Sequence, residues 1–99
     1  MNIHPTAVVD PRAELGQNVT VGAFAYIEAD VMIGEGCEIL PRATLLRYTT
    51  LGQSCRVHGG AVIGDLPQDL AYTPVESYVS IGDRCVLREG VTVHRGTKA

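Results

Sequence analysis

The sequence predicts an all-β fold, a parallel β-helix in which hexapeptide repeats wind into a stack of three-sided coils. Three observations predict it. Aliphatic residues recur every six positions, a small residue stands two positions before nearly every one of them, and glycine often follows. Fixed periods of this kind are the signature of repeat folds. With three hexads to a coil, one domain spanning residues 1–99 holds about five coils.

The aliphatic register runs unbroken through most of the chain and returns in the same frame near its end. Every position in it holds Ile, Leu or Val, which favour strands and buried positions. Its members are Ile3, Val9, Leu15, Val21, Ile27, Ile33, Ile39, Leu45, Leu51, Val57, Ile63, Ile81, Leu87 and Val93. A helix does not explain a period of six, because helical faces recur every 3.6 residues.

The second register lies two residues before the first and holds small or β-branched residues. Two inward positions separated by one outward residue are the alternation of a short strand. Its members are Ala7, Ala13, Val19, Ala25, Val31, Cys37, Ala43, Thr49, Cys55, Ala61, Val79, Cys85 and Val91. Because all three cysteines belong to it, we expect them to be small buried packing residues, with Cys37 and Cys55 stacked on adjacent coils.

Glycine directly follows the aliphatic residue in many hexads, at the point where the chain must turn a corner. The residues concerned are Gly16, Gly22, Gly34, Gly52, Gly64 and Gly82. Glycine suits a corner for two reasons, because it tolerates a positive φ and because it lets neighbouring backbones approach closely. Either reason predicts a turn after each strand.

Residues 65–80 interrupt the repeat, and we expect them to leave the coil as an external loop. Pro67 and Pro74 cannot donate hydrogen bonds to a strand ladder, and Asp69 stands where an aliphatic residue is due. Ile63 and Ile81 are three hexads apart, so the six-residue phase survives the interruption. Long loops on regular scaffolds often carry function, which makes this segment the first candidate site.

Composition and charge narrow the functional classes. A net charge of −3 provides no basic surface for nucleic acid and no polybasic patch for membranes. No apolar run approaches the roughly 20 residues of a membrane-spanning helix, and the N-terminus lacks the features of a secretory signal. We therefore expect a cytoplasmic protein without a transmembrane segment. Three cysteines without a CxxC pair favour neither a disulfide framework nor a zinc site.

The histidines His4, His58 and His94 each follow an aliphatic position, at spacings that are whole multiples of three hexads. This spacing predicts one shared edge, with His58 and His94 two coils, or about 10 Å, apart. They could not then share one zinc ion within a subunit, because Zn–N bonds are about 2 Å long. Either these are exposed corner residues, or the edge faces a partner subunit and at least one histidine contacts a ligand.

The loop places an amide, a carboxylate and a phenol close together in sequence, at Gln68, Asp69 and Tyr72. Such groups can hydrogen-bond a sugar, and they can equally cap their own loop. Their spacing leaves both interpretations open.

Three stretches of sequence resemble one family of enzymes. The opening IHPTAVVDPRAELG, the QDLAY of the loop and the later IGDRCVLREGVTVHRGT are together similar to the acyl-carrier-protein-dependent UDP-N-acetylglucosamine O-acyltransferases of lipid A synthesis. The likeness covers essentially the whole chain. Many hexapeptide acyltransferases share the opening motif, whereas QDL-x-Y at this distance before HRGT is more specific.

The resemblance implies a left-handed β-helix, a homotrimer and active sites in the clefts between subunits. It implies transfer of a hydroxyacyl chain from acyl carrier protein to the 3-hydroxyl of UDP-N-acetylglucosamine, with no metal or other cofactor. Carried over, Gln68 and Asp69 bind the sugar nucleotide, and His94 lines the same cleft. We predict Tyr72, which belongs to the same loop, as a further substrate-binding residue. The family usually has lysine where this sequence has Ala71, so one cationic contact to the substrate is missing.

The family's general-base histidine lies on a coil beyond HRGT, and this sequence stops at Ala99. No catalytic residue is therefore assigned to it. A β-helix that ends after Val93 leaves an unpaired strand edge, and HRGTKA does not resemble a cap. Either the chain is a fragment of a longer enzyme, or a partner covers that end. The family resemblance favours the N-terminal portion of a longer enzyme, which we expect to be inactive alone.

Two other functions stay open. One is a non-catalytic trimeric scaffold of hexapeptide repeats. The other is a metal protein similar to γ-class carbonic anhydrase, because His58 and His94 are expected on one edge, although no third histidine follows His94. A reading frame that continues past HRGTKA into a histidine-containing coil would favour the acyltransferase, and a metal assay without zinc would remove the last alternative.

Overall fold

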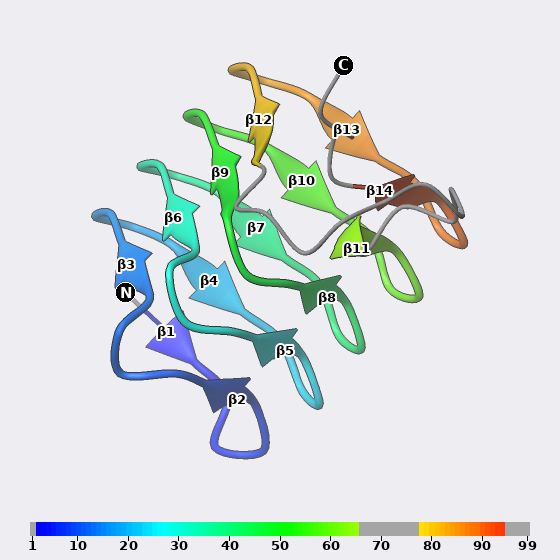
Figure 1. Ribbon diagram of the computed structural model, residues 1–99. Coiled ribbons are helices and arrows are strands. Elements are labelled where there is room, and N and C mark those ends of the chain that lie inside the picture. The colour runs from blue at the N-terminus through cyan, green and yellow to red at the C-terminus, as the bar shows by residue number, and fades with distance from the viewer. Residues whose placement is uncertain (1, 66–77, 95–99) are drawn as a thin grey trace.

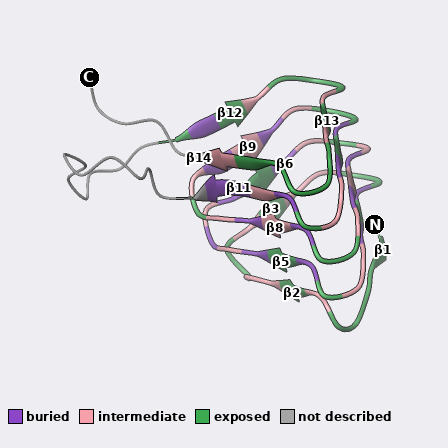
Figure 2. Ribbon diagram, turned by 90° about the vertical axis from the view of Figure 1, so that its right-hand side faces the viewer, coloured by how far each residue is buried: buried purple, intermediate pink, exposed green. Residues whose placement is uncertain are grey.

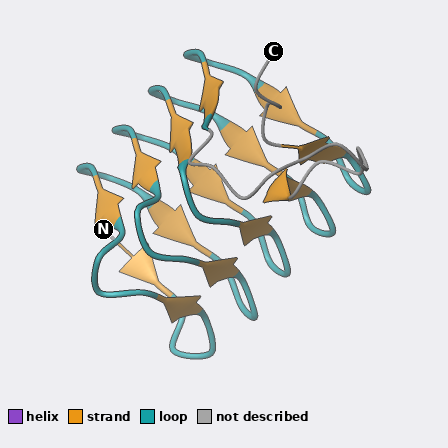
Figure 3. Cartoon of the chain, viewed as in Figure 1, coloured by secondary structure: helices purple, strands orange, loops and turns teal. Residues whose placement is uncertain are grey.

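The computed structural model describes residues 2–65 and 78–94, and in these ranges the chain consists of short parallel strands joined by turns (Figure 1). Strands and loops account for this whole part of the chain (Figure 3). Across the same residues, no helix has the length and apolar character required to cross a membrane.

The strands form three parallel sheets, one for each side of the coil. The first sheet contains, in spatial order, β1 (Asn2–Ile3), β4 (Thr20–Val21), β7 (Glu38–Ile39), β10 (Arg56–Val57) and β13 (Val86–Leu87). The second contains β14 (Thr92–His94), β11 (Val62–Asp65), β8 (Thr44–Leu45), β5 (Tyr26–Ile27) and β2 (Val8–Val9). The third contains β12 (Val79–Ile81), β9 (Thr49–Leu51), β6 (Met32–Ile33) and β3 (Glu14–Leu15).

Each strand pairs with the strand three elements further along the chain, which confirms the predicted parallel β-helix. Val21 lies opposite Ile39, and Ile27 lies opposite Leu45, so aliphatic residues three hexads apart stack on adjacent coils. Three hexads therefore make one coil, and the stack has about five coils. The coil is left-handed, as the family resemblance implied.

The core is the interior of the coils and is filled by the two predicted registers. Its buried members are Val19, Val21, Ala25, Ile27, Val31, Ile33, Cys37, Ile39, Ala43, Leu45, Leu51, Cys55, Val57, Ala61, Ile63 and Val79. Residues in the first and last coils are more exposed, as Figure 2 shows by colour. Ile3, for example, is 40% exposed, whereas Ile27 is fully buried.

The two possible roles of glycine, a positive φ and close backbone approach, occur at different positions of the corners. The left-handed backbone conformation falls two residues beyond most of the predicted glycines, for example at Asn18 and Phe24, each with φ of 59°. Gly22 instead permits close approach, because a Cβ there would lie 2.6 Å from the backbone nitrogen of Pro41 on the next coil. Gly64 combines both roles, with φ of 91° and no room for a Cβ.

The interruption is shorter at both ends than the predicted loop of 65–80. Asp65 ends β11 and Val79 begins β12, because both residues join ladders with neighbouring coils. Residues 66–77 lie outside the described residues. Before this segment, paired residues are three hexads apart, as in Asn2 and Thr20; across it they are five hexads apart, as in Arg56 and Val86.

The interruption therefore shifts the phase of the coil by two hexads while it preserves the phase of the hexad itself. It also aligns the cysteines, because Cys55 follows Cys37 by three hexads and Cys85 follows Cys55 by five. Cys37 and Cys55 are buried and Cys85 is half-buried, which confirms them as packing residues. Burial raises the pKa of the Cys37 thiol, and its Sγ donates to the carbonyl oxygen of Gly52 at 3.0 Å.

Candidate functional site

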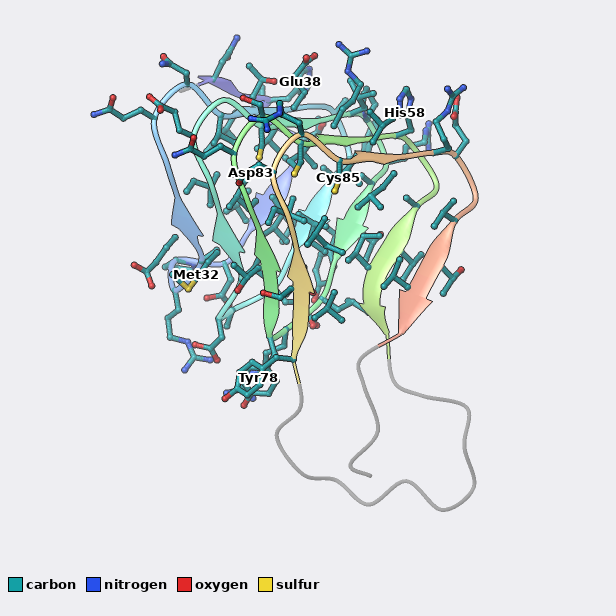
Figure 4. All side chains as sticks on the ribbon, turned by 90° about the horizontal axis from the view of Figure 1, so that it is seen from above. Met32, Glu38, His58, Tyr78, Asp83 and Cys85 are labelled. Atoms are coloured by element: carbon teal, nitrogen blue, oxygen red, sulfur yellow. The ribbon has the colours of Figure 1, made fainter. Side chains whose placement is uncertain are left out.

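The candidate site lies at the corner between the second and third sheets, where the chain leaves β11 and later begins β12. Of the four predicted substrate-binding residues, Gln68, Asp69 and Tyr72 lie outside the described residues. His94 is the last residue of β14, on the coil next to β11. Figure 4 shows Tyr78, which directly precedes β12, at this corner.

The backbone of His94 lies beside the residue from which the predicted loop departs. Val93 pairs with Ile63, and His94 then pairs with Asp65 instead of Gly64, so the register slips at this point. A slip of this kind is a β-bulge, and bulges redirect a strand and the side chains that follow it. The structure thus brings together His94 and the point of departure of the segment that contains Gln68 and Asp69.

Gly64 and Thr49 meet inside the coil at this bulge. A Cβ on Gly64 would collide with Oγ1 of Thr49 and would lie 3.1 Å from the carbonyl oxygen of Leu46. Oγ1 of Thr49 donates to the carbonyl oxygen of Ile63 at 3.4 Å. The backbone amide of Leu46 donates to the same oxygen at 2.8 Å. The last regular residue before the bulge is therefore held from two positions on the preceding coil.

The predicted single edge of three histidines is wrong. His4 and His58 do follow strands of the first sheet, but His94 belongs to the second sheet. The reason is the shift of two hexads, which places Leu87 above Val57 and hence Arg88, not His94, on the next coil above His58. The expected alignment of His58 with His94 was the basis of the carbonic-anhydrase alternative, which therefore loses its support.

Charged groups form a linked cluster at the same corner, on the coils below the site. The guanidinium of Arg47 donates from Nε to Asp30 Oδ2 at 2.8 Å, and its backbone amide donates to Glu28 Oε1 at 2.9 Å. The hydroxyl of Tyr26 donates to Glu28 Oε2 at 3.3 Å. The negative charge of Glu28, assisted by this hydrogen bond, raises the pKa of Tyr26.

Aromatic rings continue this cluster to the point where β12 begins. The guanidinium carbon of Arg47 lies 4.7 Å from the ring centroid of Tyr48, and the rings of Tyr48 and Tyr78 meet edge-to-face at 5.1 Å. Together with Met32 and Asp30, these side chains line an open groove of about 320 Å³. Tyrosine and arginine are enriched at interaction surfaces, so the groove is a candidate contact region beside the site.

His58 lies at a different corner from the candidate site, on the far side of the molecule from Tyr78 in Figure 4. Its Nδ1 is 3.7 Å from Glu89 Oε1, and Arg88 Nε is 3.2 Å from the same oxygen. The backbone amide of Glu89 and then Arg88 lower the pKa of this carboxyl. The side chain of His58 thus lies beside a carboxylate of its own corner, which favours a corner residue over a ligand contact.

Within residues 2–65 and 78–94, no three His, Cys, Asp or Glu side chains gather as metal ligands would. The described atoms of the site are polar backbone groups, one buried hydroxyl and the tyrosine and arginine side chains near β12. Such groups can bind and orient a polar ligand through hydrogen bonds and ring stacking.

Sequence reasoning did not identify the contribution of Thr49 or of the cluster around Arg47 and Tyr48. Thr49 carried a detectable signal, since it is the only hydroxyl in a register otherwise filled by apolar residues and cysteine. Arg47 and Tyr48 gave no comparable signal, because charged and aromatic residues also occur at other corners. Their association with Tyr78, five hexads beyond Tyr48, depends on the phase shift.

Comparison with known proteins agrees with the repeat and with the motifs. The family model described as bacterial transferase hexapeptide (six repeats) matches residues 12–47. A curated acyl-[acyl-carrier-protein]–UDP-N-acetylglucosamine O-acyltransferase of Brucella ovis is 39% identical over 95 residues, which cover 96% of this chain and 34% of that protein. The chain therefore spans about a third of the length of the curated relatives it matches.

Solved structures of proteins named as UDP-N-acetylglucosamine acyltransferases are also similar to this chain. A UDP-N-acetylglucosamine acyltransferase from Bacteroides fragilis superposes with a TM-score of 0.93 at 40% identity, over 95% of this chain and 37% of that one. The enzyme of the same name from Campylobacter jejuni gives 0.91 at 41% identity, over 97% and 37%. The resemblance indicated by the sequence motifs is thereby confirmed along nearly the whole chain.

Proposed function

We propose that this chain, which is similar to part of the UDP-N-acetylglucosamine O-acyltransferases, contributes the sugar-nucleotide side of such an active site. The reaction is transfer of a hydroxyacyl chain from acyl carrier protein to the 3-hydroxyl of UDP-N-acetylglucosamine, the first step of lipid A synthesis. The supporting observation is continuous similarity over 96% of the chain to enzymes named for this activity.

In this proposal, Gln68, Asp69, Tyr72 and His94 bind the substrate. A carboxylate accepts hydrogen bonds from sugar hydroxyls, while an amide and a phenol can both donate and accept. The backbone pairing of His94 with Asp65 supports a common site, because it puts His94 next to the start of the segment that contains the other three residues. We assign no catalytic residue to this chain. The proposal includes a cytoplasmic homotrimer with its sites between subunits.

The sugar-nucleotide site is tested by Asp69→Ala in the protein expressed from its complete reading frame. We expect weaker binding of UDP-N-acetylglucosamine by calorimetry, by about tenfold or more, because a charged hydrogen-bond acceptor is removed. The oligomeric state should not change. The matched control is Glu35→Ala, an exposed carboxylate in the turn between β6 and β7 and outside the groove beside the site, which should bind as the unaltered protein does.

Unchanged affinity in Asp69→Ala would contradict the assignment of the loop. If the unaltered protein does not bind UDP-N-acetylglucosamine at all but still forms a trimer, the non-catalytic scaffold is the correct interpretation. An acyl-transfer assay on the same preparations separates binding from catalysis.

A further inference from the structure

Thr49 is an exception in its register. Val31 occupies the equivalent position on the preceding coil, and Val79 pairs directly with Thr49 on the following one. Valine has nearly the shape of threonine and carries no hydroxyl that must be desolvated. Thr49 is fully buried, and within the described part of the chain it is the one buried polar residue. Packing alone therefore does not explain the hydroxyl.

The hydroxyl acts on the bulge between β11 and β14. Its hydrogen bond reaches Ile63, the last residue in regular register, and its oxygen occupies the space that a side chain at Gly64 would need. Gly64 has φ of 91°, a backbone conformation that is strained for residues with a side chain. There is also no space for a Cβ at this position, so only glycine fits. Directly after it, Asp65 pairs with His94.

We infer that Thr49 is a positioning residue: its hydroxyl holds Ile63 and Gly64 in the bulged conformation that sets Asp65 opposite His94. The part that concerns ligand binding rests on the proposed function, because His94 belongs to the predicted sugar-nucleotide site. Thr49 lies inside the coil and acts through the backbone of β11, without touching the substrate.

The test compares Thr49→Val, which removes only the hydroxyl, with Thr49→Ser, which retains it, in the protein expressed from its complete reading frame. The matched control is Thr20→Val, an exposed threonine of β4 in the first sheet, which lies away from the bulge and outside the groove beside the site. Valine already fills this register on both neighbouring coils, so Thr49→Val should fold and keep its thermal midpoint within a few degrees.

The first readout is amide hydrogen exchange in peptides covering 62–65 and 92–94. We expect about tenfold faster exchange in Thr49→Val, near-normal exchange in Thr49→Ser and no change in Thr20→Val. The second readout is steady-state kinetics. The KM for UDP-N-acetylglucosamine should rise severalfold in Thr49→Val, while the KM for the acyl donor and kcat stay close to those of the unaltered enzyme.

Unchanged exchange in Thr49→Val overturns the inference, whatever the kinetics show. Faster exchange with an unchanged KM restricts the role of Thr49 to the bulge and overturns its role in ligand binding. Faster exchange in a protein that never binds UDP-N-acetylglucosamine retains the positioning role while refuting the proposed function, so the two failures are distinguishable.

Discussion

At the scale of single residues, the narrow spacing between coils decides which substitutions the corners accept. Neighbouring strands in a sheet are about 4.8 Å apart, and this distance leaves little room between one corner and the next. At Gly22 the backbone of Pro41 occupies the space of a side chain, whereas a Cβ at Gly82 would meet no atom within 4 Å. Two glycines at the same step of the repeat therefore have different physical roles.

This difference predicts opposite effects of the same substitution. Gly22→Ala should lower the free energy of unfolding by about 1–3 kcal/mol, because backbone and ring atoms of Pro41 cannot rotate away from the new methyl group. Gly82→Ala should be neutral or should stabilise the fold by about 0.4–1 kcal/mol, since it reduces the entropy of the unfolded chain. Urea unfolding of both variants measures the difference, and equal losses would contradict it.

Buried cysteines add a second example at this scale. Sγ of Cys37 donates to the carbonyl oxygen of Gly52, and Sγ of Cys55 donates to that of Gly82, each at 3.0 Å. Each thiol thus bonds to a glycine corner of the following coil. These cysteines fill the small inward register, and each also donates a hydrogen bond to a backbone carbonyl oxygen.

At the scale of elements, most strands are very short, so an isolated strand has little stability. The hydrogen bonds that join coils, such as Thr20 N–H to Cys37 O at 3.0 Å, connect each strand to its neighbours in the stack. Stability in such a fold is shared between adjacent repeats, and the middle coils have neighbours on both sides. A residue at the same register position therefore contributes more to the free energy of unfolding in a middle coil than in an end coil.

Two isoleucines of the same register test this expectation. Ile27→Ala in β5 should cost about 2–5 kcal/mol, because the side chain is fully buried between neighbouring coils. Ile3→Ala in β1 should cost less than about half as much, since Ile3 is 40% exposed. Denaturant unfolding monitored by circular dichroism compares them, and a cost at Ile3 equal to that at Ile27 would refute the dependence on position in the stack.

At the scale of the whole molecule, the segment between β11 and β12 changes which residues become neighbours. The coil continues after it with the same hexad phase, but its paired residues are five hexads apart instead of three. As a result, Tyr48 meets Tyr78, Cys85 follows Cys55 in the interior column, and His94 reaches Asp65.

A cross-link between exposed strand positions tests this phase. Arg56 and Val86 pair directly, and paired strand residues have a Cα separation compatible with a disulfide. In a Cys85→Ala background, Arg56→Cys with Val86→Cys should form a disulfide under mild oxidation, detected by mass spectrometry of peptides. The control pair, Arg56→Cys with Thr92→Cys, is six hexads apart in sequence but lies on different sheets, and it should not cross-link. The reverse result would contradict the shift of two hexads.

The repeat, the core residues, the class of fold and the family resemblance were all predictable from the sequence. They were predictable because strand alternation and the limited space inside one coil restrict which residue types can point inward, as at Ile27 and Cys37. These restrictions recur in every hexad, so they produce a periodic pattern in the sequence. The predicted substrate-binding residues Gln68, Asp69 and Tyr72 came from motif similarity and remain predictions.

Which residues meet between coils depends instead on the three-dimensional path of the chain. A spacing of three hexads predicts neighbours only while every residue belongs to the coil. The sequence does not show how many residues of an interruption still belong to the coil. For that reason His94 was placed with His58, whereas the structure pairs its backbone with Asp65. The role inferred for Thr49 also depends on this pairing, because its hydroxyl can stabilise a bulge only where the register between β11 and β14 shifts.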